Sequence, residues 1–404
     1  MRTRSISLFV APLLIAGALA ACSERSPSLA APAGPRLSVT PTNAFTLIES
    51  GGTHSCGLTS GGQGWCWGRN AQGQLGDSTA ASTQVPVAVF QPGLTFATIT
   101  AGASHTCALD GSGQAYCWGT NGDGRLGDST FVLPLMPSAV LPLGGLSFAS
   151  ISAGGAHTCG LDSSGAAYCW GSNTFAQVGD STKTFAYGPH AVRMPVGVTF
   201  TQISAADKHT CALDGSTGQA YCWGYGGDGA VGNNSLLGSR IPVAVQQPMG
   251  VTFVAIDAQV NHSCGITSGG QAYCWGLNGS GQLGDGTSTN RLVPTAVSQP
   301  VVVTFAAISA GSNQTCALDG SGQGYCWGLN TNGQLGNGTN TQSLTPVAVS
   351  MPVGVAFSQI RTGSSFSCGL DGSVGQAYCW GINGFSQLGD NSTVAKNVPT
   401  AVAH

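Results

Sequence analysis

The stretch S-H-T-C-A-L-D-G-S-G-Q-A-Y-C-W-G-T-N-G-D-G-R-L-G-D, from Ser104 to Asp128, decides the fold because it recurs along the chain. It holds two cysteines ten positions apart, a Tyr-Cys-Trp-Gly run, and Gly or Asp at each bend. Seven copies are present, and their first cysteines are Cys56, Cys107, Cys159, Cys211, Cys264, Cys316 and Cys368. A near-constant period of 51 to 53 residues is typical of a propeller or a solenoid, built from one supersecondary unit per repeat.

Each copy contains four short β-runs separated by Gly-, Asp- and Pro-rich turns, with no helical window. Four strands around an axis make a propeller blade, so the sequence predicts an all-β, seven-bladed β-propeller over residues 45–404. The composition agrees, because the chain holds 62 Gly and only two Glu. Whether the final run, 399–402, completes its own blade or is lent to another stays open.

The repeat also carries a specific resemblance. The recurring W-G-x-N-x-x-G-Q-L-G-D segment, for example Trp275-Gly276-Leu277-Asn278 and Gln282-Leu283-Gly284-Asp285, together with the recurring A-G-x-x-H-T-C-A-L pattern, resembles the RCC1 (regulator of chromosome condensation) repeat family. The likeness covers residues 45–404. It implies the seven-bladed propeller of four-stranded blades, in agreement with the period.

The N-terminus resembles a bacterial lipoprotein signal. Arg2 and Arg4 precede an apolar run, and Leu19-Ala20-Ala21-Cys22 follows, so we expect residues 1–21 to be removed and Cys22 to be lipid-modified. The alternative is a plain secretory signal. Residues 22–44, rich in Ser, Pro and Ala, are expected to form a tether. The predicted location is the bacterial cell envelope, with the protein lipid-anchored to a membrane or otherwise secreted.

The charge balance argues against nucleic-acid binding. The chain has 13 Lys and Arg against 16 Asp and Glu, and phosphate backbones require clustered cations. No second stretch is apolar for long enough to span a membrane, so we expect membrane attachment only through the N-terminal lipid. We expect a monomer.

The remaining fourteen cysteines fall into pairs, two per repeat. If the hairpin folds about Ser112, Cys107 faces Cys117 across neighbouring strands. Two repeats have eleven positions instead of ten, and their extra residue lies in the turn, which preserves the opposition. Because export exposes cysteines to oxidation, we predict seven disulfides: Cys56–Cys66, Cys107–Cys117, Cys159–Cys169, Cys211–Cys222, Cys264–Cys274, Cys316–Cys326 and Cys368–Cys379.

A metal site is the alternative interpretation of these cysteines. Five histidines, each two positions before a first cysteine, would share its strand face: His54, His105, His157, His209 and His262. The spacing lacks a zinc knuckle, and Gln314 and Phe366 replace the imidazole in the last two repeats. We therefore expect buried histidines satisfied by neighbouring backbone groups. Calcium in the G-Q-L-G-D loops is a second alternative, but these loops lack an alternating carboxylate pattern. No metal or cofactor is predicted.

No catalytic constellation is evident in the sequence. Ten of the fourteen Asp lie in hairpin turns or end the G-Q-L-G-D loops, where Asp caps backbone amides. The chain has no nucleophile elbow, phosphate loop or zinc-protease motif. We predict that it is not an enzyme.

The loops that do not repeat are the candidate binding surface. Aromatic and cationic side chains are the usual anchors of interfaces, whereas the repeated Trp are expected to be core. The candidate binding face comprises Arg69, Arg125, Phe131, Phe175, Lys183, Phe185, Tyr187, Tyr225 and Phe385. The alternative is that these are ordinary loop residues with no common partner.

Three functions are consistent with these features. The first is a scaffold that binds a protein or a glycan through its variable loops. The second, guanine-nucleotide exchange, is implied by the resemblance to RCC1, but it requires a cytoplasmic or nuclear GTPase. The third is a secreted enzyme inhibitor, because the repeats are also similar to the bacterial β-lactamase-inhibitory propeller.

Overall fold

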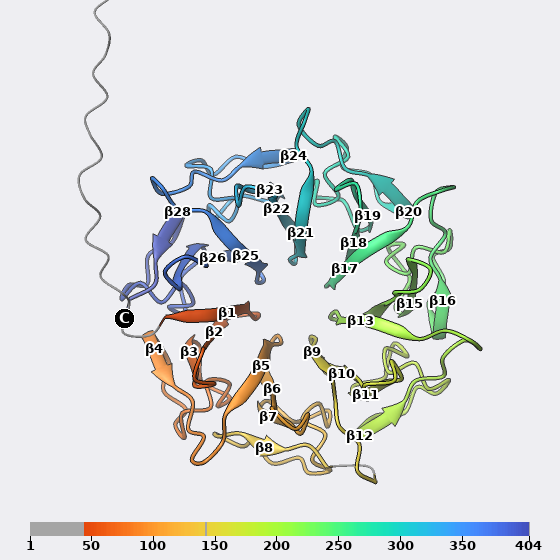
Figure 1. Ribbon diagram of the computed structural model, residues 1–404, viewed down its shortest axis with the longest axis vertical. Coiled ribbons are helices and arrows are strands. Elements are labelled where there is room, and N and C mark those ends of the chain that lie inside the picture. The colour runs from red at the N-terminus through yellow and green to blue at the C-terminus, as the bar shows by residue number, and fades with distance from the viewer. Residues whose placement is uncertain (1–43, 142–143, 404) are drawn as a thin grey trace, which may run out of the picture. The chain divides into compact units, whose positions relative to one another are not determined.

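The computed structural model describes residues 44–141 and 144–403, and the expected signal peptide, Cys22 and nearly all of the tether lie outside them. The described chain forms seven four-stranded antiparallel sheets arranged around an axis as the blades of a propeller (Figure 1). The predicted all-β, seven-bladed architecture is therefore confirmed. No helix among the described residues has the length and apolar character needed to cross a membrane.

Within each blade the strands follow chain order from the axis to the rim. The inner strands are β1 (Phe45–Ser50), β5 (Phe96–Ala101), β9 (Ser150–Ala153), β13 (Phe200–Ala205), β17 (Phe253–Gln259), β21 (Phe305–Ala310) and β25 (Phe357–Thr362). The second strands are β2 (His54–Thr59), β6 (His105–Asp110), β10 (His157–Leu161), β14 (His209–Asp214), β18 (His262–Thr267), β22 (Gln314–Asp319) and β26 (Phe366–Asp371).

The third strands carry the C-W-G runs: β3 (Gly64–Gly68), β7 (Ala115–Gly119), β11 (Ala167–Gly171), β15 (Gln219–Gly224), β19 (Ala272–Gly276), β23 (Gly324–Gly328) and β27 (Gln376–Gly381). The outer strands are β4 (Thr83–Ala88), β8 (Ser138–Ala139), β12 (Ala186–Ala191), β16 (Ser239–Ala244), β20 (Arg291–Ala296), β24 (Ser343–Ala348) and β28 (Lys396–Ala401). The last strand, β28, pairs with β27, so the C-terminal run completes its own blade.

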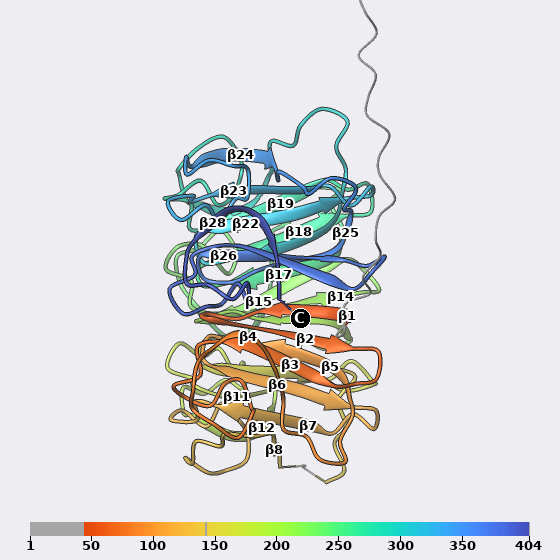
Figure 2. The ribbon, with the colours of Figure 1, turned by 90° about the vertical axis from the view of Figure 1, so that its left-hand side faces the viewer.

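The antiparallel order gives the propeller two distinct faces (Figure 2). The loops after the third strands, such as residues 69–82, emerge on one face together with the connections between inner and second strands. We call this the loop face. The hairpin turns between second and third strands, such as residues 111–114, emerge on the opposite face, which we call the turn face. Candidate loops of different blades therefore lie on one surface.

The cross-strand register confirms the predicted disulfides. In blade 2, Leu109 pairs with Ala115, and Cys107 pairs with Cys117. Each blade contains one such disulfide with a Cα–Cα distance of 4.1 Å, in the predicted pairing. The two blades with an eleven-residue separation absorb the extra residue in the turn and keep the same register.

The tryptophans of the C-W-G runs form the core between blades, as predicted. All seven are 0% exposed, and Trp118 stacks on Phe96 with ring centroids 5.9 Å apart. Its indole Nε1 donates to the carbonyl of Gln74 in the preceding blade at 3.0 Å. A buried Trp needs such a partner for its N–H, and here the bond also fixes the spacing between two blades.

The histidines are buried at the same junctions, but their partner differs from the expected backbone group. The hydroxyl of Thr106 donates to the carbonyl of Gln74 at 2.7 Å, and it therefore accepts a bond from His54 Nε2 at 2.9 Å. His105, His157, His209 and His262 bond a hydroxyl of the next blade in the same way. The histidine bonds a hydroxyl and not a backbone group because a hydroxyl can accept from the imidazole while it donates to a carbonyl.

Candidate functional site

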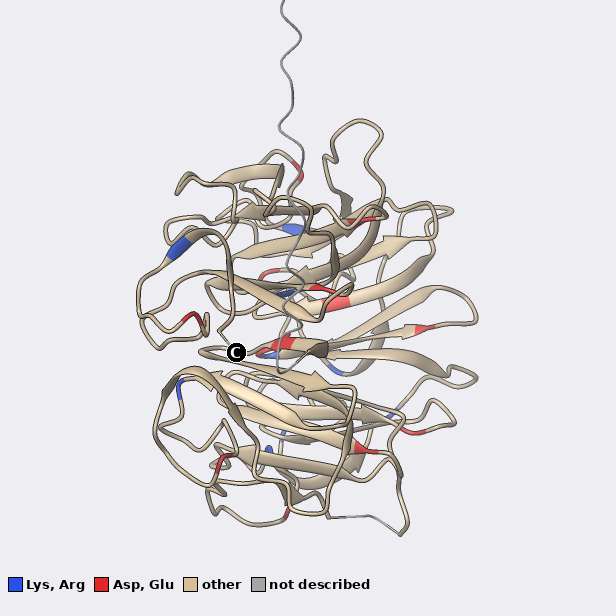
Figure 3. Ribbon diagram, turned by 60° about the vertical axis from the view of Figure 1, so that its left-hand side comes forward, with Lys and Arg blue, Asp and Glu red and all other residues tan. Residues whose placement is uncertain are grey.

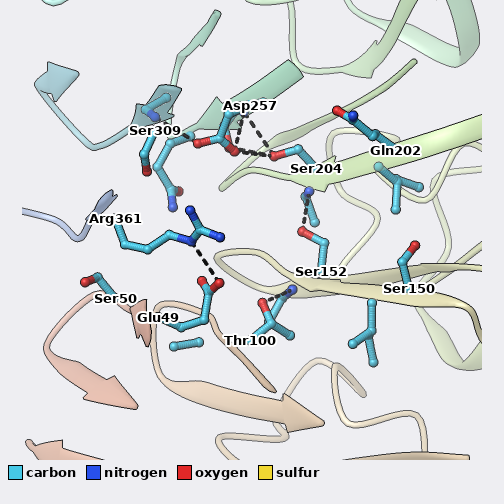
Figure 4. Close-up of a pocket in the computed structure, with 18 of the residues that line it drawn as sticks. Glu49, Ser50, Thr100, Ser150, Ser152, Gln202, Ser204, Asp257, Ser309 and Arg361 are labelled. Atoms are coloured by element: carbon cyan, nitrogen blue, oxygen red, sulfur yellow. Dashed lines mark hydrogen bonds and ion pairs between the residues drawn. The ribbon is translucent and has the colours of Figure 1, made fainter. Parts of the chain in front are cut away.

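A polar cavity of about 390 Å³ lies on the propeller axis, lined by the inner strands (Figure 4). Residues of all seven inner strands line it, and in every blade they include the residue after the inner-strand isoleucine: Glu49, Thr100, Ser152, Ser204, Asp257, Ser309 and Arg361. The isoleucines at the preceding position are buried in five blades and partly buried in the other two, and several of them also border the cavity. The pattern reads I-x-A in five blades, and its variable residue lines the cavity.

These axial side chains join neighbouring blades. At five of the seven junctions a side-chain oxygen accepts a bond from a backbone N–H of the next blade. The pairs are Ala153 to Thr100, Ala205 to Ser152, Ala258 to Ser204, Ala310 to Asp257, and Thr362 to Ser309. A short acceptor at this position therefore fastens one inner strand to the next.

The charged groups of the cavity close the ring between the last and first blades. Arg361 Nε donates to Glu49 Oε1 at 2.9 Å, and the Glu49 charge raises the pKa of Arg361. The side-chain amide of Gln359 spans two backbone groups of β1, accepting from Ile48 N and donating to Thr46 O. Blades 7 and 1 are therefore joined by noncovalent contacts between side chains and backbone. The cavity has a structural role, because Glu49 and Arg361, which line it, make one of these contacts.

Asp257 is the remaining charged residue on the axis. Burial raises its pKa, while hydrogen bonds from Ala310 and Ser204 and the charge of Arg361 act in the opposite direction. Both carboxylate oxygens accept bonds from neighbouring blades, Oδ1 from Ser204 at 2.9 Å and Oδ2 from Ala310 at 2.8 Å. No group of three metal-ligating His, Cys, Asp or Glu side chains is present within the described residues.

The loop face brings several of the predicted binding residues together over blades 2 to 4. Phe131 of blade 2 meets Tyr187 of blade 3 edge to face, with ring centroids 5.0 Å apart. Phe175 of blade 3 meets Tyr225 of blade 4 in the same geometry at 5.5 Å. Each pair bridges a junction between blades. Phe131, Phe175 and Tyr187 are 63%, 39% and 40% exposed and so are available to a partner, whereas Tyr225 is partly buried.

The other predicted residues occupy different places. Lys183 is exposed and Phe185 is half-buried, both in the loop that leads into β12. The guanidinium of Arg69 lies over the ring of Phe385, 4.9 Å from its centroid, at the junction of blades 7 and 1. This second cluster is separate from the one over blades 2 to 4.

Arg125 does not belong to the exposed face, which corrects the prediction. Its side chain is buried, donates from Nη1 to the carbonyl of Gly155 at 2.8 Å, and pairs with Asp123. Arg125 takes the position that Gln occupies in five of the other six blades, and there the chain turns inward between two blades. The sequence pattern alone does not show this burial.

Sequence reasoning missed four residues beside the Phe175–Tyr225 pair. Lys208 Nζ lies 5.6 Å from the Phe175 ring centroid and 5.7 Å from that of Tyr225, which is cation–π geometry. Leu236, Leu237 and Arg240 line a pocket beside the same rings. The available signal was the departure of blade 4 from the W-G-x-N pattern, where Gly226 replaces Asn.

Charged residues are sparse over the rest of the molecule (Figure 3). Many of the described cations are already paired with carboxylates, as in Arg291 with Asp285 and Lys396 with Asp390. The hairpin aspartates cap their turns as predicted, since Asp110 Oδ1 accepts from the backbone N–H of Ser112 and of Gln114. These cations and carboxylates therefore already make contacts that stabilise the fold.

The comparisons with known proteins identify the family. The model of the RCC1-like domain matches residues 17–307 and 136–404. The chain belongs to the RCC1-like domain family. It is 28% identical over 364 residues to the ultraviolet-B receptor UVR8 of Arabidopsis thaliana, an alignment that covers 90% of this chain and 82% of the receptor. It is 27% identical to the human E3 ubiquitin-protein ligase HERC2 over 80% of this chain but only 7% of that enzyme.

Solved structures of RCC1-like propellers share the fold. Human WBSCR16 aligns with a TM-score of 0.76 at 22% identity, covering 85% of this chain and 94% of that structure. Yeast RCC1 (Prp20), solved in a complex with Kap60, aligns with a TM-score of 0.75 at 21% identity, covering 84% of this chain and 83% of that structure. Within this RCC1-like fold, the disulfide in every blade indicates an oxidising, extracytoplasmic location.

Proposed function

We propose that this protein is an exported, monomeric scaffold that binds a protein partner on its loop face, over blades 2 to 4. The observation that carries the proposal is the pair of aromatic bridges, Phe131–Tyr187 and Phe175–Tyr225, which present three exposed rings and one partly buried ring on neighbouring junctions. Exposed aromatic residues with adjacent cations are typical anchors of protein interfaces.

The proposal includes attachment to the cell envelope through lipid on Cys22. Support comes from the L-A-A-C sequence at residues 19–22 and from the disulfides, which fit an exported chain. Metabolic labelling with a palmitate analogue tests the anchor, because wild-type protein would carry the label and Cys22→Ser would lose it. Label-free wild-type protein would contradict the lipid anchor and leave a plain secretory signal.

A glycan is the other partner class for such a surface, but Leu236 and Leu237 favour a protein. Both side chains are largely exposed beside the Phe175–Tyr225 pair. Exposed leucines match apolar side chains better than sugar hydroxyls, which need polar groups placed around them. We further propose that the protein is not an enzyme and acts by binding alone.

Affinity capture from the native cell envelope tests the function. The mature wild-type chain is expected to retain a protein partner, and Phe131→Ala/Phe175→Ala is expected to retain at least tenfold less. Phe385→Ala is the matched control, because Phe385 holds in blade 7 the loop position that Phe175 holds in blade 3. Equal capture by all three proteins would refute the proposed face.

The same preparation distinguishes the alternative functions. A secreted inhibitor would form a stoichiometric complex with an enzyme and abolish its activity. An exchange factor would accelerate nucleotide release from a GTPase. A scaffold would capture its partner without either effect.

A further inference from the structure

Blade 4 departs from the repeat at one position that shapes its loop. In the other six blades an asparagine follows the W-G-x run, and its buried side chain organises the loop. Asn173, for example, accepts from Val178 N at 3.0 Å and donates to Asp180 Oδ1 at 3.2 Å. The residue at this position in blade 4 is Gly226.

The backbone of blade 4 fills the space of the missing asparagine. A Cβ on Gly226 would collide with the carbonyl of Leu237, so residues 237–238 pass through the place that the asparagine side chain takes elsewhere. The side chains of Leu236 and Leu237 stay outside, 56% and 76% exposed. The backbone of this loop therefore lies further inward than in the other blades, and its leucine side chains remain at the surface.

A pocket of about 270 Å³ results between blades 3 and 4. Phe175 and Tyr225 contribute its aromatic wall, with their rings 5.5 Å apart at 76°. Leu236, Leu237 and residues 226–227 complete the apolar part of the lining. Ser181 N donates to the carbonyl of Arg240 at 3.0 Å, which fixes the two blades against each other at this site.

The charge of the pocket is positive. Lys183 and Arg240 line it, and neither has a carboxylate within 4.0 Å among the described residues, whereas Arg291, Arg361 and Lys396 are paired. No Asp or Glu is among the described residues that line it. Lys208 Nζ lies above the aromatic pair but is also 4.0 Å from Asp207 Oδ2, so only Lys183 and Arg240 are counted as unpaired cations. Unpaired cations beside apolar walls match a ligand that carries a carboxylate next to an apolar group.

We propose that this pocket binds an acidic peptide segment of the partner. A carboxylate of the peptide lies between Lys183 and Arg240, and a neighbouring apolar side chain packs against Phe175, Tyr225 and Leu237. The inference rests on the proposed function and names the chemistry of its partner. An acidic glycan shares the charge but has no apolar side chain for the leucines.

Selection from a random peptide library tests the pocket. The immobilised mature chain is expected to enrich peptides with Asp or Glu adjacent to Leu, Ile or Phe. A synthetic copy of the best peptide should bind at least tenfold more weakly to Lys183→Gln/Arg240→Gln and also when its acidic residues are changed to amides. Arg193→Gln is the matched control, because Arg193 is exposed, lies just beyond the end of β12 and is not among the residues that line the pocket.

The results that would overturn the peptide site differ from those that would overturn the proposed function. Absence of enrichment, enrichment without acidic residues, or unchanged affinity in Lys183→Gln/Arg240→Gln would overturn the peptide site. Polygalacturonate that binds more tightly than the peptide and displaces it would overturn it in favour of a glycan. Partner capture that depends on Phe131 and Phe175 but not on Lys183 and Arg240 would refute the pocket and leave the proposed function standing.

Discussion

At the residue scale, the second glycine of each G-Q-L-G loop sets the distance between neighbouring blades. Gly284 has a φ of +71°, and a Cβ there would lie 2.6 Å from Trp327 Nε1 in the next blade. Both the left-handed backbone and the indole exclude a side chain. The glycine of each G-Q-L-G loop is thus required by the Trp of its neighbour.

Gly284→Ala is therefore expected to destabilise the propeller by about 2–4 kcal/mol, from backbone strain and overpacking together. Urea unfolding measures the change. Gly279→Ala in the same blade is the control, because nothing lies within 4 Å of a Cβ placed there. Equal stability of the two variants would show that the Trp does not limit the spacing.

Single residues were predictable where the repeat fixes their environment. The buried Trp and the turn-capping Asp follow from local pattern and spacing, and the structure confirms both. Arg125 was wrongly placed at the surface because its partner, the carbonyl of Gly155, belongs to another blade. The repeat pattern of blade 2 does not show a contact that its Arg makes with a backbone carbonyl of blade 3.

At the element scale, the hairpin of the second and third strands is closed by its disulfide. Changing Cys107 and Cys117 together to Ala is expected to cost about 2–4 kcal/mol, because the ten-residue loop regains its freedom in the unfolded chain. Urea unfolding under non-reducing conditions measures the loss, and mass spectrometry counts the remaining disulfides. A stability that equals wild type would contradict this role.

The buried histidines make these junctions sensitive to acid. Burial lowers the pKa of His262 to about 3, from 6.5 in an unfolded chain. The unfolded state therefore takes up a proton first, and stability should fall as the pH drops below about 6.5 towards the folded-state value. His262→Gln copies blade 6, where Gln314 holds this position, and should flatten the slope by up to about 1.4 kcal/mol per pH unit.

Unfolding by urea at a series of pH values between 7.5 and 4.5 measures that slope. Parallel curves for wild type and His262→Gln would show that the imidazole does not control acid stability. The sequence predicted burial of these histidines but not their partner. The Thr or Ser that each one bonds lies in the next blade, about 52 positions away.

At the scale of the whole molecule, the ring closes without an exchanged strand. The Arg361–Glu49 pair joins blades 7 and 1, and its side chains are 33% and 20% exposed. Each single change, Arg361→Gln or Glu49→Gln, is expected to destabilise the propeller by about 1–3 kcal/mol, because it leaves a half-buried charge without its partner.

A double-mutant cycle tests closure, and the expected coupling is about 1 kcal/mol or more. Lys396 and Asp390 give a control pair within blade 7, at 3.4 Å, and their cycle should leave the contact between blades 7 and 1 intact. Additive effects of Arg361→Gln and Glu49→Gln would show that other contacts close the ring.

The period of the sequence was enough to predict seven blades, and the turn insertions were enough to predict the disulfide register. The pocket between blades 3 and 4 was not predictable in the same way. It depends on where the backbone of Leu237 lies once Gly226 has removed a side chain, and that is a three-dimensional consequence of a one-residue change. Phe175, Lys183 and Tyr225 were among the predicted residues, but Lys208 and Arg240 were not.

The central claim is that binding belongs to the loops of blades 2 to 4 and not to the repeated frame. Photo-crosslinking in the native envelope tests it directly, with benzoylphenylalanine placed singly at positions 131, 175 and 332. Asn332 has the same loop position in blade 6 as Phe175 has in blade 3. One shared protein adduct is expected at 131 and 175, and none at 332. Equal adducts at all three positions, or an adduct only at 332, would contradict it.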